Sequence, residues 1–79
     1  MNQMQDSLGE PLATGHIVAA RKQLEATFPA GGACRIAKGT PGIVEDFIHD
    51  EQRVLVGFEA ENGATISVHA DPGKLYITN

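Results

Sequence analysis

Apolar residues recur along this chain with two different periods. In the first third, four of them are spaced so that they would share one face of a helix: Ile17, Ala20, Leu24 and Phe28. This stripe predicts an α-helix over 13–28, ended by a proline and two glycines within 29–32. From residue 31 onward apolar and polar residues alternate, which is the period of β-strands.

The alternating region divides into short strands separated by glycine- and proline-containing turns. We expect five strands, over 33–38, 43–49, 53–59, 64–70 and 74–78. The glycine turn at 39–42 would join the first two strands into a hairpin, and a 3₁₀ turn at 71–73 would precede the last. The whole pattern predicts a mainly β fold, in which a helix precedes a five-stranded barrel over about 31–79. Residues 1–12 are predicted to be a mobile segment and 13–79 a single domain.

The register of the hairpin that joins 53–59 to 64–70 follows from its apolar residues. A two-residue loop at Asn62-Gly63 would place Glu59 opposite Ile66 and so bring a glutamate to the core face. A three-residue loop with Gly63 in a left-handed conformation instead pairs Phe58 with Ile66. In that register the inward pairs are Phe58/Ile66 and Val56/Val68, and the outward pairs are Glu59/Thr65, Gly57/Ser67, Leu55/His69 and Arg53/Asp71.

The strand at 43–49 does not follow simple alternation. Val44 and Phe47 both have the character of core residues, yet they are three positions apart. A β-bulge near Glu45-Asp46, or a sharp bend, would bring both to one face; in the other arrangement Ile48 replaces Phe47 in the core. The sequence leaves these two arrangements open. It also leaves open whether the predicted helix packs on its own barrel or on a neighbouring subunit.

The stretch from Gly31 to Val44, GGACRIAKGTPGIV, resembles the opening hairpin of SH3-like barrels of the KOW type. The shared pattern is a glycine start, an alternating apolar strand, a Gly-x-x-Gly turn and a following valine. The resemblance extends more loosely to Asn79. It implies a five-stranded SH3-like barrel, and it says little about function because this barrel serves many roles.

A second resemblance, to the plasmid-borne type II dihydrofolate reductases, rests on Ala26-Thr27-Phe28 and on the shape of 62–77. Those enzymes are tetramers of short SH3-like barrels around a central pore. Their pore carries a Gln-Ile-Tyr triplet, which binds cofactor and folate. The corresponding place here is Thr65-Ile66-Ser67, which lacks the glutamine and the tyrosine, so the residues that carry the activity are absent. A pore-forming oligomeric enzyme of this kind is one alternative function.

Charge and composition narrow the classes of partner. The 79 residues carry six Lys and Arg against ten Asp and Glu, a net charge of −4. Nucleic-acid-binding modules usually present a basic face, so the acidic balance counts against them. A KOW-like nucleic-acid module stays an alternative that would use four cations: Arg35, Lys38, Arg53 and Lys74. The chain has no secretory signal pattern or long apolar run, and we expect a cytoplasmic protein without membrane contact.

Chemistry-bearing residues are sparse. The histidines at 16, 49 and 69 and the single Cys34 have no metal-ligand spacing, so we expect no metal, cofactor or catalytic residues.

Leu55 and Tyr76 point outward in the predicted register, and exposed large side chains of this kind suit an interface. The candidate interface residues are Leu55, Ser67, His69 and Tyr76. We therefore expect a non-catalytic small barrel that binds another protein or itself as a homo-oligomer.

Overall fold

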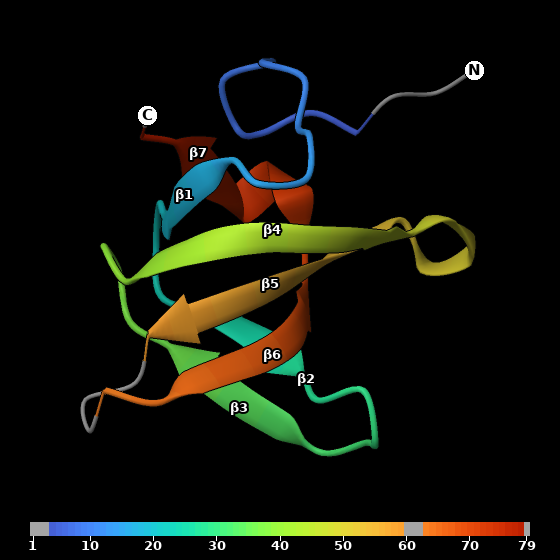
Figure 1. Cartoon of the computed structure of the whole chain (residues 1–79), viewed down its shortest axis with the longest axis vertical. Helices are drawn as coiled ribbons and strands as arrows, with labels where there is room; N and C mark the ends of the chain where they lie inside the picture. The colour runs from blue at the N-terminus through green and yellow to red at the C-terminus, as the bar shows by residue number, and fades with distance from the viewer. Residues whose placement is uncertain (1–3, 60–62, 79) are drawn as a thin grey trace.

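A computed structural model of the protein describes residues 4–59 and 63–78. In that part of the chain seven strands form one curled antiparallel sheet in the order β3-β2-β6-β5-β4-β1-β7 (Figure 1). The strands are β1 (Ile17–Ala20), β2 (Leu24–Thr27), β3 (Ala33–Ile36), β4 (Pro41–Ile48), β5 (Arg53–Glu59), β6 (Thr65–Ala70) and β7 (Leu75–Ile77). Two 3₁₀ turns, η1 (His49–Glu51) and η2 (Pro72–Lys74), complete the regular structure. The result is a small all-β half-barrel, compatible with an SH3-like barrel.

The predicted helix over 13–28 is wrong, because these residues form β1 and β2. Leu24 and Ala26 are buried while Glu25 and Thr27 are exposed, so this stretch alternates with the period of a strand. The glycines that were expected to end a helix instead close a hairpin between β2 and β3. Gly31 and Gly32 have φ of 102° and 93°, values that suit glycine in a tight loop.

The predicted opening hairpin and the five-strand count are wrong for the same reason. β3 pairs with β2, and β4 pairs with β1 and β5, so the turn at 37–40 is a corner between strands that do not pair with each other. β1 and β2 add two strands to the five expected. The predicted 3₁₀ turn before the last strand is confirmed as η2.

The register predicted for the β5–β6 hairpin is confirmed. Phe58 pairs with Ile66, Val56 with Val68, and Leu55 with His69. Gly63 has φ of 84°, in the left-handed region, while Glu61 and Asn62 of the predicted loop lie outside the described residues. The pairing ends at Val54 and Ala70, one position before the predicted outward pair of Arg53 and Asp71, and the Asp71 carboxylate accepts the Gly73 N–H at 2.9 Å.

A β-bulge lies between Val44 and Asp46, as one of the two arrangements of this strand requires. Glu45 is the extra residue. Beyond it Phe47 is half-buried and packs against the core, whereas Ile48 is half-buried at the strand's end. The bulge therefore decides in favour of Phe47 as the residue that reaches the core.

The core fills the inner side of the curled sheet with side chains from every strand. Phe58, Val54, Val56 and Val68 are fully buried there. Met4 and Leu12, from the segment that was expected to be mobile, are also buried in this cluster. The described part of the chain contains no helix that is long and apolar enough to cross a membrane.

Candidate binding face on the outer side of the sheet

One rung of the sheet crosses four neighbouring strands on its outer side. Ile17 of β1 pairs with Ile43 of β4, Ile43 pairs with Gly57 of β5, and Gly57 pairs with Ser67 of β6. The two isoleucines are 40% and 50% exposed. Large apolar side chains are rarely left this open in the middle of a sheet unless something covers them.

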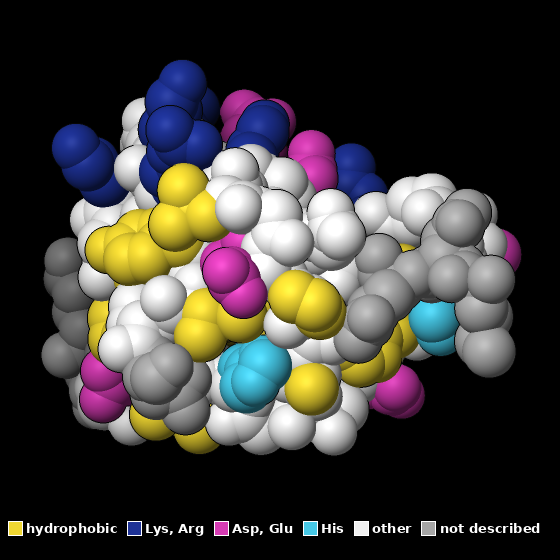
Figure 2. All heavy atoms as spheres, turned by 90° about the horizontal axis from the view of Figure 1, so that it is seen from above, with side chains coloured by type: hydrophobic (Ala, Val, Ile, Leu, Met, Phe, Trp, Pro, Cys, Tyr) yellow, Lys and Arg dark blue, Asp and Glu magenta, His cyan; other side chains and the backbone are white. Residues whose placement is uncertain are grey.

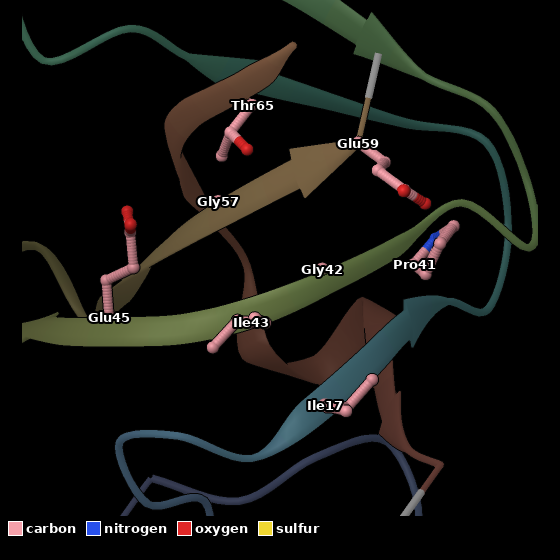
Figure 3. Close-up of a pocket in the computed structure, with 8 residues that line it drawn as sticks. All are labelled: Ile17, Pro41, Gly42, Ile43, Glu45, Gly57, Glu59 and Thr65. Carbon is pink, nitrogen blue, oxygen red and sulfur yellow. The ribbon is translucent and has the colours of Figure 1, made fainter. Parts of the chain in front are cut away.

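The rung is hollowed where it crosses β4 and β5. The hollow has a volume of about 440 Å³ (Figure 3). Its lining residues come from four strands and are Ile17, Pro41, Gly42, Ile43, Glu45, Gly57, Glu59 and Thr65. Gly57 leaves β5 bare at this point, because a side chain there would rise between Glu45 and Thr65. Gly42 of β4 faces the core instead, where a Cβ would lie 2.7 Å from the Val56 Cγ1.

Gly57 leaves little room for a side chain. A Cβ there would lie 2.9 Å from the Thr65 Cγ2 and 3.1 Å from the Glu45 Oε2, so these side chains would have to move. The Glu45 carboxylate lies beside β5 instead, and its Oε1 accepts a hydrogen bond of 2.8 Å from the Ser67 hydroxyl. Gly57 thus allows a side chain from β4 to reach β6 across the intervening strand.

Two glutamates give the hollow its charge. Glu45 extends from the bulge of β4, and Glu59 stands at the end of β5 on another side of the hollow (Figure 3). Both are exposed. An apolar pair beside two carboxylates can accept the long aliphatic stem and cationic head of lysine or arginine.

Three of the four residues expected at an interface lie together beside this hollow. Leu55 and His69 are directly opposite each other, and Ser67 follows two residues before His69 on β6. The His69 Nδ1 is 3.2 Å from the Glu51 Oε1. Tyr76 lies elsewhere on β7, opposite Ala19 and separated from β5 by β4 and β1.

The residues that line the hollow escaped the sequence prediction. Ile17 was assigned to a helical face, and Ile43 to the start of a strand without a partner on β1. The one signal in the sequence was Gly57, a glycine within the apolar run VLVGF, which often marks a close approach to a strand.

The structure separates the four cations proposed for nucleic acid. Lys38 and Lys74 lie in two turns that meet near Arg21 and Lys22. The Arg21 N–H donates to the Lys74 carbonyl at 2.8 Å, and the Gly39 N–H donates to the Ala20 carbonyl at 2.7 Å. Figure 2 shows Lys and Arg side chains gathered along one margin, with acidic side chains between some of them. Arg35 lies on β3 opposite Glu25, and Arg53 begins β5, opposite Ile48.

The residues with reactive side chains lie apart from one another and make local contacts. They are the histidines, Cys34 and the triplet Thr65-Ile66-Ser67, which occupies the place of the reductase Gln-Ile-Tyr triplet. The His16 Nδ1 accepts the Ala13 N–H at 3.1 Å, and the His49 ring stacks on Phe47 at 6.0 Å. Across residues 4–59 and 63–78 no group of three His, Cys, Asp or Glu side chains is arranged to hold a metal ion. Burial raises the pKa of the Cys34 thiol. Within the triplet only Thr65 and Ser67 face outward, because Ile66 packs against the core.

Comparison with known proteins adds no family. No protein-family model matches the chain, and no match was found among curated proteins or among solved structures.

Proposed function

We propose that this protein is a non-catalytic binding module and that its hollow takes a lysine or arginine side chain of a partner protein. The observation that carries the proposal is the exposed Ile17/Ile43 pair beside Glu45 and Glu59, at the point where Gly57 leaves β5 bare. The isoleucines would cover the aliphatic stem of the cation, and the carboxylates would bind its head. The net charge of −4 would favour the approach of such a basic segment.

The hydrogen bonds of Ser67 and His69 support binding rather than catalysis. The Ser67 hydroxyl donates to Glu45, and His69 faces Glu51, so these two residues do not form a pair of nucleophile and base. Leu55, Ser67 and His69 would extend the contact surface beyond the hollow. We further propose that the curled sheet is an SH3-like barrel of the KOW type, because its shape is compatible with such a barrel and the sequence over 31–44 resembles one, although these residues form β3, a corner and the start of β4 rather than a hairpin.

The proposal is tested by selecting peptides from a random library displayed on phage against the immobilised protein. We expect the selected peptides to share a lysine or arginine next to an apolar residue. Ile17→Thr/Ile43→Thr and Glu45→Gln/Glu59→Gln should each weaken binding by about tenfold or more, which corresponds to roughly 1.4 kcal/mol. Affinity should also fall as salt rises, because exposed charges are screened.

Leu8→Thr is the matched control for the apolar variant. Leu8 is 68% exposed, belongs to the N-terminal loop and does not line the hollow. Its replacement should leave peptide affinity unchanged. Selected peptides without a shared cation, or equal binding to all variants, would show that the hollow is not the binding site.

Nucleic acid is the second candidate, favoured by the gathering of Arg21, Lys22, Lys38 and Lys74 in three turns that hydrogen bonds bring together. This function would require a salt-dependent affinity for an oligonucleotide that falls when Lys38 and Lys74 are neutralised, and it would leave the hollow unused.

A further inference from the structure

The two edge strands of the sheet, β7 and β3, differ in whether their outward backbone groups have hydrogen-bond partners. At the β7 edge the N-terminal loop occupies the free backbone groups: the Ile77 N–H donates to the Asp6 Oδ2 at 3.0 Å, and the Leu75 carbonyl accepts the Ser7 N–H at 2.7 Å. Figure 1 shows this loop beyond β1 and β7, opposite the β3 edge. Sealing of this kind is how proteins prevent an edge strand from pairing further.

At the other edge β3 pairs with β2 alone. The Phe28 N–H donates to the Gly32 carbonyl at 2.9 Å, which makes 28 and 32 a hydrogen-bonded pair. Antiparallel pairs alternate, so the backbone groups of Cys34 and Ile36 face β2 as well. The N–H and C=O groups of Ala33 and Arg35 therefore face away from the sheet, and within the described residues they have no partner.

We infer that a second copy of this chain pairs along β3, antiparallel, with Ala33 of each copy opposite Arg35 of the other. A two-fold axis through the Cys34 pair generates this register, and it satisfies the outward groups of both copies together. The inference is independent of the proposed function, because the hollow lies on β1, β4, β5 and β6.

Three observations favour a second copy as the occupant. The outward groups are symmetric about Cys34, so an identical strand matches them without an offset. Arg35 would face the small Ala33 of the other copy, and its neighbour on β2 is Glu25, so like charges are not opposed. Phe28 and Cys34 pack against the core yet are only half-buried, and a continued sheet would cover them further.

The register makes a geometric prediction about Cys34. When 33 and 35 form the hydrogen-bonded pairs, Cys34 faces Cys34 of the second copy in a non-hydrogen-bonded pair, with Cα atoms about 4.5 Å apart. This separation lies within the range of a disulfide. Oxidation by diamide would join the two thiols: the pair loses two protons and two electrons, and the diazene is reduced to its hydrazine.

The test combines light scattering with site-directed cross-linking of the full chain. We expect a concentrated, reduced sample to have twice the 8.4 kDa mass of one chain, and diamide at mildly alkaline pH to cross-link it through Cys34. Two controls move the thiol by one residue, Cys34→Ser/Ala33→Cys and Cys34→Ser/Arg35→Cys. Each should cross-link at least about tenfold more slowly, because the same residue of the other copy is then out of disulfide range.

A further variant removes one outward donor. Arg35→Pro should lose the dimer, since the Arg35 N–H does not bond to β2. A monomeric mass at high concentration would overturn the inference. So would equal cross-linking rates at 33, 34 and 35, which indicate random collision, and this comparison holds even if the proline variant fails to fold.

Discussion

Single residues shape the outer face of this sheet and hold its edge. Gly57 keeps β5 free of a side chain at the point where Glu45 reaches towards Ser67. Alanine there would push against Thr65 and Glu45 and fill part of the hollow. Asp6 has a comparable role at the β7 edge, where one carboxylate anchors the N-terminal loop to β7.

The Asp6 carboxylate is 6% exposed and accepts the backbone N–H groups of Leu8, Glu10 and Ile77. Desolvation alone would raise its pKa, but these hydrogen bonds outweigh that effect and hold the pKa of Asp6 below its ordinary value. A depressed pKa stabilises the fold above the pKa of the unfolded chain, about 3.9, and this stabilisation is lost as pH falls through the folded value.

Asp6→Asn should therefore lower the free energy of unfolding by roughly 1.5–3 kcal/mol at neutral pH. The deficit should shrink as pH falls below about 4, because the wild-type carboxyl is then neutral as well. Urea unfolding of both proteins from pH 7 to 2 measures this, with Asp50→Asn, in the exposed turn η1, as a matched control. A deficit that is the same at every pH would mean that the charge of Asp6 contributes nothing.

At the scale of elements, the N-terminal loop acts as an edge cover for β7. It adds Met4 and Leu12 to the core and occupies the outward groups of Leu75 and Ile77. Residues that the sequence suggests are a mobile segment therefore complete the sheet on one side.

Deletion of residues 1–12 should lower the free energy of unfolding by roughly 3 kcal/mol or more, since burial of one leucine in a core is already worth about 2–5 kcal/mol. It should also increase aggregation through the opened β7 edge. If the shortened chain does not fold, hydrogen exchange in the full chain decides the matter. The Ile77 amide should be protected as strongly as a core amide, whereas a mobile segment would leave it in rapid exchange.

The sequence predicts an element correctly where the local order of apolar and polar residues allows one register. Phe58 and Ile66 could be paired because a one-residue slip would bring Glu59 to the core. The bulge near Glu45 was one of the arrangements that the spacing of Val44 and Phe47 left open, and only the pairing of β4 with β5 selects it. The helix failed because small residues such as Ala20 and Ala26 suit either period, and only pairing with distant strands selects the strand. The hollow was missed for the same reason, since Ile17 meets Ile43 only through the pairing of β1 with β4.

For the whole molecule, the open β3 edge and the hollow lie on different strands. A dimer formed through β3 would therefore carry two hollows on one continuous sheet, and a partner with two basic segments would gain affinity from binding both. Nothing in this arrangement requires the hollow to change shape on dimerisation.

The most direct test of the central claim is to locate the bound peptide by NMR. A ¹⁵N-labelled sample is titrated with a lysine- or arginine-containing peptide from the selection, and amide shifts are followed residue by residue. We expect the largest shifts at Ile17, Ile43, Gly57 and Thr65 around the hollow, and their loss in Glu45→Gln/Glu59→Gln. Shifts centred on β3, on the basic margin or on Tyr76, with the hollow unaffected, would contradict the account.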